Sequence, residues 1–194
     1  MIPTTALLNI QGLTFHRDWQ VILHDVNLEV GTAKWLVLRG GNGCGKTTLL
    51  KLCVGLLTPT TGTLTLSGTY SYLGHLNGIK PTQTLAGMIQ SLPPNGQTSA
   101  KNLAESLGMT AYFDVPFHQL SAGLKRRIAL VQFLTPKVNI YIVDEPLDNL
   151  DPASCHLVWQ LLAEKVNHGA AILMAHHGSL PFQHPAIQEV FLDV

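Results

Sequence analysis

The sequence predicts an α/β fold built around a mainly parallel sheet. Short apolar runs at 35–38, 139–143 and 170–175 have the length of strands that are buried on both faces. A helix-period pattern at 46–57 and a further helical segment at 152–167 separate them along the chain. Strands and helices that alternate in this order indicate an α/β architecture with a parallel core.

The other strands of the predicted fold lie toward the two ends of the chain. LLNIQGLTF (7–15) and VILHDVNLEV (21–30) mix apolar and polar residues in short runs, which is typical of two half-buried antiparallel strands. TLTLSG (63–68) predicts an edge strand, and EVFLDV (189–194) predicts a last strand. These segments add a small antiparallel part to the parallel core.

A mostly helical segment is expected at 82–135. We expect a loop at 91–99 to interrupt it, because Pro-Pro and Asn-Gly are strong turn signals. With 194 residues the chain has the length of one domain, so we expect a single domain over 1–194 with 82–135 as an approximate helical subdomain within it.

Composition excludes several classes of partner. Lys and Arg total 12 and Asp and Glu total 12, so no basic excess indicates nucleic acid or anionic lipid. Charged residues make up only 12% of the chain against a usual ~25%, which suggests that a partner covers part of the surface. No apolar stretch approaches the ~18 residues of a membrane span, so we expect none in the chain itself.

Cysteine usage and the first residues favour a cytoplasmic location. The three cysteines, Cys44, Cys53 and Cys155, are an odd number at irregular spacing, which is typical of free thiols in a reducing compartment. The segment MIPTTALLNIQGLTF lacks a basic start followed by an apolar block, so we expect no signal peptide.

A phosphate-binding loop follows the strand at 35–38. Gly40, Gly41, Asn42, Gly43, Cys44, Gly45, Lys46 and Thr47 match G-x-x-x-x-G-K-[ST] between a buried strand and a helix. Glycines let backbone N–H groups approach a triphosphate, and the helix N-terminus adds partial positive charge. We expect Lys46 to neutralise the β and γ oxygens, the Thr47 hydroxyl to bind Mg²⁺, and the Thr48 backbone to reach the α-phosphate.

Two carboxylates follow the strand at 139–143. Asp144 is expected to hold Mg²⁺, and Glu145 to take a proton from the attacking water. His176 follows the strand at 170–175, which we expect beside the first, so it is a candidate contact for the γ-phosphate. His177 is adjacent and remains an alternative. The other seven histidines show no metal-ligand spacing.

A second anion-binding segment decides the class of protein. In LSAGL (120–124), Ser121 is a plausible N-cap for the helix that follows, and Ala122-Gly123 leaves free backbone donors. One nucleotide does not need two such sites from one chain. A head-to-tail pair of chains does, with each ATP between the Lys46 loop of one chain and Ser121 and Gly123 of the other.

Together these motifs resemble ATP-binding-cassette (ABC) ATPases along nearly the whole chain. LSAGL is similar to the LSGGQ signature, 144–151 resembles the Walker B and D-loop stretch with Asp151 as its aspartate, and His176 matches the switch histidine. The resemblance implies a P-loop NTPase core with a mainly parallel sheet, an antiparallel β subdomain and a short helical signature subdomain. It also implies an ATPase that uses ATP and Mg²⁺.

A closer resemblance is to the CcmA-type subunits of cytochrome c maturation. It rests on YLGHLNGIKPTQTL (72–85) and on Arg126-Arg127 after LSAG. This resemblance implies haem export, together with separate integral membrane permease subunits of the CcmB type. It implies a peripheral place on the cytoplasmic face of the inner membrane.

The sequence departs from the general family at three positions. His75 stands where a glutamine joins the core to the helical part, and Leu124 replaces the signature glutamine. Arg17 stands where an aromatic ring usually stacks on adenine, with Phe15 and Trp19 as possible substitutes. We therefore expect modest ATP affinity and poor discrimination between ATP and GTP.

Three alternatives remain beside the haem exporter. The chain is also compatible with another small two-component exporter of lipid, drug or lipoprotein. A soluble mechanical ABC ATPase is less favoured, because no coiled coil, second cassette or basic face is present. A GTPase would need N-K-x-D, which is absent, and a kinase has no use for LSAGL.

Overall fold

The five-stranded sheet at the centre of the molecule is parallel, as predicted. The computed structural model describes residues 6–75 and 78–192. Its strands lie in the order β5-β6-β7-β3-β8, and every neighbouring pair is parallel. They are β3 (Trp35–Arg39), β5 (Tyr70–Leu73), β6 (Ile140–Asp144), β7 (Ala171–Ala175) and β8 (Ile187–Phe191). The last two residues of the predicted strand at 189–194 lie outside the described residues.

The N-terminal hairpin forms a separate antiparallel sheet. β1 (Ala6–Arg17) pairs with β2 (Gln20–Gly31) and with β4 (Thr61–Leu66), in the order β2-β1-β4. The predicted antiparallel strands are confirmed, and β4 is an edge strand as expected. Strand β5 was not predicted from the sequence, because it has only four residues and includes a serine.

Alternate side chains of the parallel strands enter two different cores. In β3, Trp35 and Val37 belong to the core beneath the helical segment, whereas Leu36 and Leu38 belong to the core beneath the antiparallel sheet. All four are buried. Burial on both faces explains why the sequence of this strand is a continuous apolar run instead of an alternating one.

Helix α1 (Lys46–Cys53) begins within the phosphate loop and is shorter than the predicted 46–57. It ends near Gly55, which has φ 73°. Leu56, which the periodicity placed on the buried stripe, is 61% exposed, so that part of the prediction was wrong. A residue in the left-handed region terminates a helix because the backbone can no longer continue the i to i−4 pattern.

The segment at 82–135 holds α2 (Leu85–Gln90), α3 (Pro94–Ser106), α4 (Ala122–Leu134) and two short 3-10 turns. The predicted interruption is present, but the loop covers only 91–93 and not 91–99, because α3 begins at Pro94. Pro94 occupies the first helical turn, where a missing N–H removes no helical hydrogen bond. Asn95 and Gly96 lie in the helix and form no hairpin turn.

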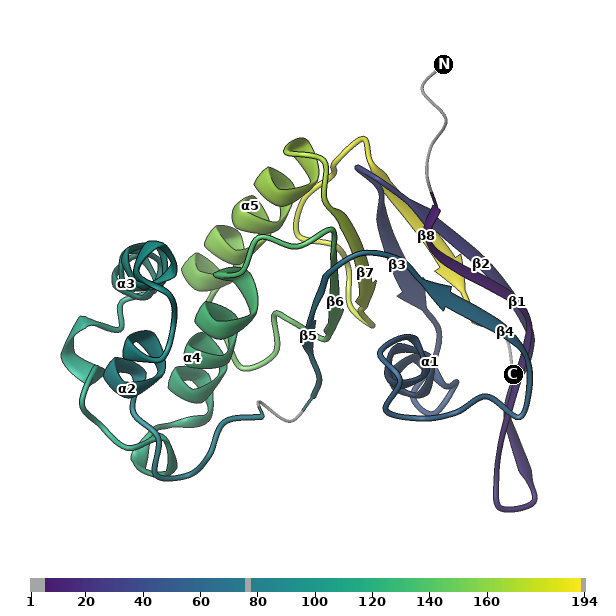
Figure 1. The fold of residues 1–194 in the computed structure, drawn as a ribbon, viewed down its shortest axis with the longest axis horizontal. Helices are drawn as coiled ribbons and strands as arrows, with labels where there is room; N and C mark the ends of the chain where they lie inside the picture. The colour runs from purple at the N-terminus through teal and green to yellow at the C-terminus, as the bar shows by residue number, and fades with distance from the viewer. Residues whose placement is uncertain (1–5, 76–77, 193–194) are drawn as a thin grey trace.

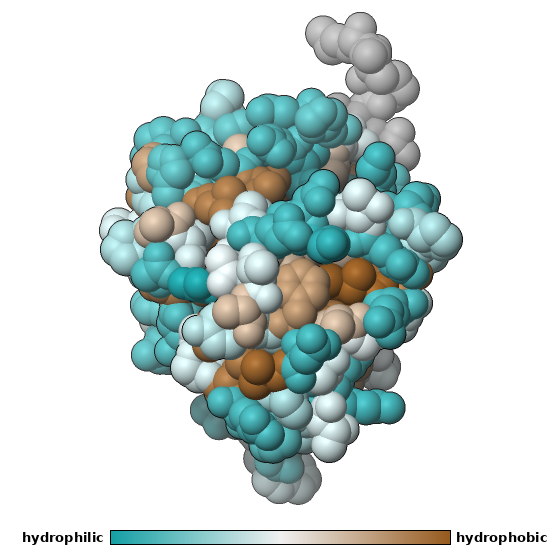
Figure 2. Space-filling model, turned by 90° about the vertical axis from the view of Figure 1, so that its left-hand side faces the viewer, coloured by the Kyte–Doolittle hydropathy of each residue, from teal (hydrophilic) through white to brown (hydrophobic). Residues whose placement is uncertain are grey.

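Helix α5 (Pro152–Asn167) has the predicted bounds. Figure 1 shows α4 and α5 on one side of the parallel sheet and α1 with the antiparallel sheet on the other. Helices α2 and α3 lie outside α4, and Figure 2 shows that this end of the molecule carries apolar patches between hydrophilic side chains. None of the helices within the described ranges is long and apolar enough to cross a bilayer.

Candidate functional site

The phosphate loop connects β3 to α1 at the carboxyl end of the sheet. Gly40, Gly43 and Gly45 have φ of 137°, 87° and 92°, in the region that L side chains rarely adopt. Gly45 is the N-cap of α1, and a Cβ there would lie 2.9 Å from the Ile22 carbonyl oxygen. The hairpin therefore packs directly on the loop and requires glycine at this position.

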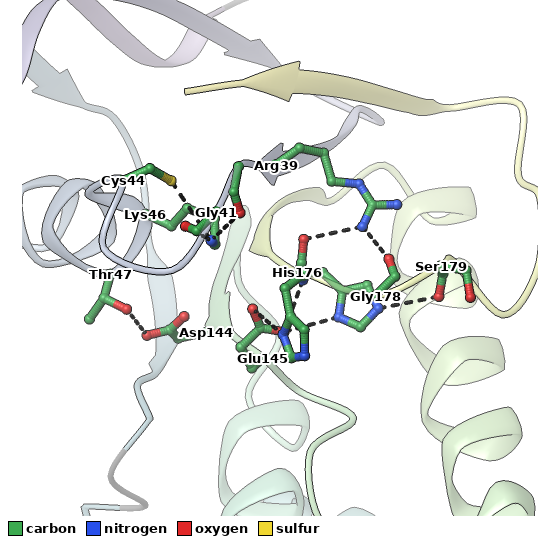
Figure 3. A network of polar contacts seen from close by, with 12 residues as sticks. Arg39, Gly41, Cys44, Lys46, Thr47, Asp144, Glu145, His176, Gly178 and Ser179 are labelled. Carbon is green, nitrogen blue, oxygen red and sulfur yellow. Dashed lines mark hydrogen bonds and ion pairs between the residues drawn. The ribbon is translucent and has the colours of Figure 1, made fainter. Parts of the chain in front are cut away.

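Lys46 turns its ammonium into the loop (Figure 3). Its Nζ donates to the carbonyl oxygens of Gly40 and Gly41 at 2.7 and 3.0 Å and lies 3.8 Å from Cys44 Sγ. The residue is only 8% exposed. A buried positive charge surrounded by loop backbone gives the site a focus for an anionic ligand.

Thr47 and Asp144 meet on the other side of the loop. The Thr47 hydroxyl donates a 2.6 Å hydrogen bond to Asp144 Oδ2, although β6 and α1 are far apart in sequence. Asp144 is the last residue of β6 and is 2% exposed. The predicted pair of magnesium ligands is therefore brought together.

Glu145 points to a different set of partners from its neighbour Asp144. Its backbone has φ 46° and is held by a 3.0 Å hydrogen bond from its N–H to the Ala175 carbonyl. Its carboxylate lies 3.0 Å from the Nδ1 atoms of both His176 and His177, one histidine on each oxygen. The side chain is 12% exposed.

The two histidines keep the Glu145 carboxylate ionised. Burial raises the pKa of Glu145, but the hydrogen bonds and the charges of His176 and His177 together leave that pKa below its ordinary value. The hydrogen bond to Glu145 raises the pKa of His177. An ionised carboxylate is the form that can accept a proton from water.

Arg126 links the carboxyl ends of β5 and β6 by hydrogen bonds to their backbone. Its guanidinium donates to the carbonyl oxygens of Asp144 and Glu145 at 2.7 and 2.6 Å, and to that of Gly74 at 3.2 Å. It is 4% exposed, and burial lowers its pKa. The sequence singled out Arg126 only through a resemblance, and its structural role was not predicted.

An open cavity of about 380 Å³ lies over these groups. Six predicted phosphate-binding residues line it: Asn42, Gly43, Gly45, Lys46, Thr47 and Thr48. Asp144, Glu145 and His177 also line it, whereas the His176 side chain is 9% exposed and contacts Glu145 and the Ser179 carbonyl. His177, the residue next to the predicted switch histidine, is therefore the one that faces the cavity.

Arg17 and Ile22 from the hairpin also line the cavity. Neither aromatic alternative lies there. Phe15 is 9% exposed and packed in the core, and Trp19 is fully exposed at the hairpin turn. His75 lines the cavity from the side of the helical segment, while Leu76 and Asn77 of the predicted 72–85 stretch lie outside the described residues.

The signature segment is built as predicted but lies apart from this cavity. Ser121 caps α4, its hydroxyl oxygen accepting a hydrogen bond from the Leu124 N–H at 3.3 Å. A Cβ on Gly123 would lie 2.7 Å from the Asn149 carbonyl oxygen, so the D-loop packs against the helix start. Neither Ser121 nor Gly123 lines the cavity beside Lys46 of the same chain.

Asp151 fixes the end of the D-loop. It caps α5 by accepting hydrogen bonds from the Ser154 N–H and hydroxyl, and it pairs with Arg127. The hydrogen bonds from Ser154 and the charge of Arg127 lower the pKa of Asp151. The predicted D-loop aspartate therefore has a clear structural role in this chain.

The donor sets in the cavity can be compared with the ligands that metal ions prefer. A hydroxyl from Thr47 and a carboxylate from Asp144 suit Mg²⁺, which binds oxygen and takes further ligands from phosphates and water. Glu145, Asp148 and His177 also place one ligand atom each within 4.8 Å of one another, but this set includes a nitrogen. The Thr47 and Asp144 pair fits magnesium better.

A phosphate loop after β3, two carboxylates at the end of β6 and a capped signature helix on this fold define a P-loop ATPase of the cassette type. A family model described as "ABC transporter" matches residues 23–148. The chain belongs to this family and is an ATP-hydrolysing ABC ATPase.

Curated relatives of this chain match it over nearly the full length of both proteins. The chain is 34% identical to the cytochrome c biogenesis ATP-binding export protein CcmA of Pseudomonas syringae pv. syringae, over 93% of the chain and 92% of that protein. It is 32% identical to the CcmA protein of Hyphomonas neptunium, over 98% and 99%. The expected resemblance to CcmA-type proteins is confirmed.

Solved structures confirm the fold. One ATP-binding subunit of an ABC transporter superimposes with a TM-score of 0.81 at 24% identity, over 88% of this chain and 79% of that chain. An ABC transporter ATP-binding protein from Pyrococcus furiosus gives a TM-score of 0.78 at 20% identity, over 95% and 96%. At these identities the likeness supports the fold alone.

Proposed function

We propose that the chain is the nucleotide-binding subunit of the exporter that supplies haem for cytochrome c biogenesis. The observation that carries the hydrolytic part is the convergence of Lys46, the Thr47 and Asp144 pair, and Glu145 on one cavity. The observation that favours haem export is the identity with CcmA export proteins over more than nine tenths of the chain.

The phosphate loop binds the triphosphate of ATP. Six residues of the loop and of the first turn of α1 line the cavity, where the helix dipole favours negative charge. Lys46 leaves the carbonyls of Gly40 and Gly41 and turns to the β and γ oxygens. The base lies toward Arg17 and Ile22, where stacking on an aromatic ring is replaced by a guanidinium.

Thr47 and Asp144 hold Mg²⁺ when ATP binds. Their side-chain oxygens already lie 2.6 Å apart, and both residues line the cavity. The ion neutralises charge on the phosphate oxygens during transfer. Asp144 is the last residue of β6, and its carbonyl oxygen accepts a hydrogen bond from Arg126. Both features fix the position of the Asp144 carboxylate.

Glu145 accepts the proton of the attacking water. Two histidines hold its carboxylate, so its orientation does not depend on the nucleotide. His177 faces the cavity and His176 lies behind Glu145. In the assembled site, His176 orients the Glu145 carboxylate toward the γ-phosphate. Lys46 stabilises the negative charge that develops on the γ-phosphate oxygens.

A second copy completes each site in a head-to-tail dimer. Ser121 and Gly123 do not line the cavity of their own chain, which supports a role toward the nucleotide of the other chain. The Ser121 hydroxyl keeps its hydrogen free to donate while its oxygen accepts from Leu124. The start of α4 adds backbone donors and its positive end.

ATP hydrolysis opens the head-to-tail dimer, and separate membrane subunits of the CcmB type receive this motion. We place the chain as a peripheral subunit at the cytoplasmic face of the inner membrane. The absence of a spanning helix among the described residues is consistent with this place. The low share of charged residues, 12%, is consistent with a surface that a partner covers.

A pull-down tests the proposed function. Tagged Glu145→Gln is expressed, membranes are solubilised gently with Mg·ATP, and the proteins that co-purify are identified. We expect a small polytopic protein of the cytochrome c maturation system. Recovery of a different permease would contradict the haem assignment, and recovery of no membrane protein from a wholly soluble chain would favour a mechanical ABC ATPase.

A further inference from the structure

Arg39 lies beside the phosphate loop but faces away from its cavity. It is the last residue of β3, directly before Gly40, and its side chain is 11% exposed. It is not among the residues that line the cavity beside Lys46. Its guanidinium instead points to the loop that follows β7 and carries the candidate switch histidine (Figure 3).

The guanidinium of Arg39 holds the backbone of that loop. Its Nη1 donates to the carbonyl oxygens of His176, at 3.1 Å, and Gly178. The N–H of His176 donates to the Leu38 carbonyl of the same strand at 3.2 Å. Two successive residues of β3 therefore fix both backbone polar groups of His176.

The ring of His176 depends on this backbone position. Its Nδ1 lies 3.0 Å from Glu145 Oε2, and its Nε2 lies 3.4 Å from the Ser179 carbonyl. Gly178 packs against the ring, since a Cβ there would lie 3.5 Å from His176 Nε2. A displacement of this loop by about 1 Å away from Glu145 would take the ring out of hydrogen-bond distance.

Glu189 of β8 sets the orientation of Arg39. Its carboxylate accepts from Arg39 Nε at 2.8 Å and is 38% exposed. Because the guanidinium is a rigid planar fork, fixing Nε directs Nη1 toward the two loop carbonyls. A lysine offers a single ammonium and cannot bridge the carboxylate and both carbonyls in this geometry.

We propose that Arg39, oriented by Glu189, is a positioning residue that holds His176 against the Glu145 carboxylate. It sets the rate of ATP hydrolysis without contacting the nucleotide. This inference rests on the proposed role of Glu145 and His176 in hydrolysis. It assigns a role to a residue outside the phosphate loop, the carboxylate pair and the signature helix.

The test compares Arg39→Gln, Arg39→Lys and Glu189→Gln with the wild-type full chain. We expect Arg39→Gln to keep its ATP dissociation constant within about twofold while kcat falls about tenfold or more, since misplacing a catalytic group by ~1 Å is costly. Arg39→Lys should recover little of this loss. Glu189→Gln keeps an acceptor for Nε and should lose only about threefold.

An NMR measurement separates positioning from general destabilisation. The ring ¹⁵N signals of His176, assigned with a His176→Gln variant, should change in Arg39→Gln and Arg39→Lys at temperatures where both are folded. Lys101→Gln, an exposed change in α3, is the control and should leave rate and signals as in the wild type.

Two results would overturn the proposal. One is wild-type kcat in Arg39→Gln, and the other is a parallel loss of ATP affinity and kcat with unchanged His176 signals. If Arg39→Gln does not fold, Glu189→Gln and Arg39→Lys decide the matter by the same measurements. Glu145→Gln is run alongside, because wild-type turnover in that variant contradicts the proposed function and not the role of Arg39 alone.

Discussion

The hydroxyl of Thr47 donates a 2.6 Å hydrogen bond to the carboxylate of Asp144, 97 residues further along the chain. This contact joins the start of α1 to the end of β6 at the floor of the cavity. A hydroxyl and a carboxylate held side by side are oxygen ligands of the kind that magnesium prefers. The relationship between these two residues therefore leads to a prediction about metal dependence.

Removing the Thr47 hydroxyl should weaken magnesium binding. We expect Thr47→Ala to raise the Mg²⁺ concentration for half-maximal ATPase activity by about tenfold, because one ligand of the ion is lost. Thr47→Ser retains the hydroxyl and serves as the matched control, with a shift of less than about twofold. A titration of activity with Mg²⁺ measures both, and equal Mg²⁺ dependence in the two variants would contradict the assignment.

Replacing Glu145 by glutamine should separate binding from hydrolysis. We expect kcat to fall by about 100-fold or more, because an amide cannot accept the proton of water. The ATP dissociation constant should stay within about twofold, since Glu145 bonds histidines and not the phosphate loop. Glu164→Gln, an exposed change in α5, is the control. Turnover of Glu145→Gln at the wild-type rate would rule out the role of this base.

Gly123 should not tolerate a side chain. Its Cβ position lies 2.7 Å from the Asn149 carbonyl oxygen, so Gly123→Ala must push the D-loop away from α4. We expect a loss of about 1–3 kcal/mol in the free energy of unfolding and a loss of ATP-dependent dimerisation, with ATP binding to the monomer retained.

Gly96 provides the matched glycine for this experiment. It lies in α3, and its nearest neighbour would be 3.6 Å from an added Cβ, which is ordinary contact. Gly96→Ala should raise the free energy of unfolding by about 0.5–1 kcal/mol, because alanine favours helix. Thermal unfolding and sedimentation measure both variants. A Gly123→Ala protein that dimerises like the wild type would show that the D-loop contact is not needed.

The contact between His177 and Glu145 should make stability depend on pH. The hydrogen bond to Glu145 raises the pKa of His177 above 6.5, so its stabilising contribution is full below pH 6.5. That contribution is lost as pH rises through the raised pKa. Glu145 stays ionised over this range because its own pKa lies below 4.5.

A variant that lacks only His177 tests this pH dependence. The difference in Tm between the wild type and His177→Gln should be larger at about pH 5.5 than at about pH 8.5. Thr98→Ala, an exposed change in α3 that removes no titratable group, is the control and should show no such trend. A Tm difference that is constant or grows with pH would contradict the proposed ion pair.

The sequence revealed those parts of the fold that follow from local patterns. The apolar runs of β3, β6 and β7 and the glycines from Gly40 to Gly45 were sufficient to predict strands and a phosphate loop. Pro94 was misinterpreted as a loop residue, because proline at the first turn of a helix and proline in a loop give the same local signal.

The support of the site was beyond sequence reasoning. Arg39 donates to the His176 carbonyl 137 residues away, and Arg126 donates to the Asp144 carbonyl. Backbone carbonyls carry no residue-specific signal, so such bonds cannot be inferred from the types of residue involved. His176 was expected to face the cavity, but His177 does. Which of the two faces it depends on the path of the loop after β7, and no motif specifies that path.

The central claim is that each ATP lies between the Lys46 loop of one chain and Ser121 of another. A mixing experiment tests it most directly, with Glu145→Gln added to both chains to trap ATP. One chain carries Lys46→Ala and the other Ser121→Arg. A head-to-tail pair of these two chains has one intact composite site, whereas either chain alone has none.

Sedimentation with Mg·ATP measures the outcome. We expect the Glu145→Gln parent to dimerise, each double variant alone to stay monomeric, and the mixture to form an ATP-dependent heterodimer. If the parent dimerises but the mixture does not, or if either double variant dimerises alone as well as the parent, the nucleotide is not shared between Lys46 and Ser121 of two chains and the account is contradicted.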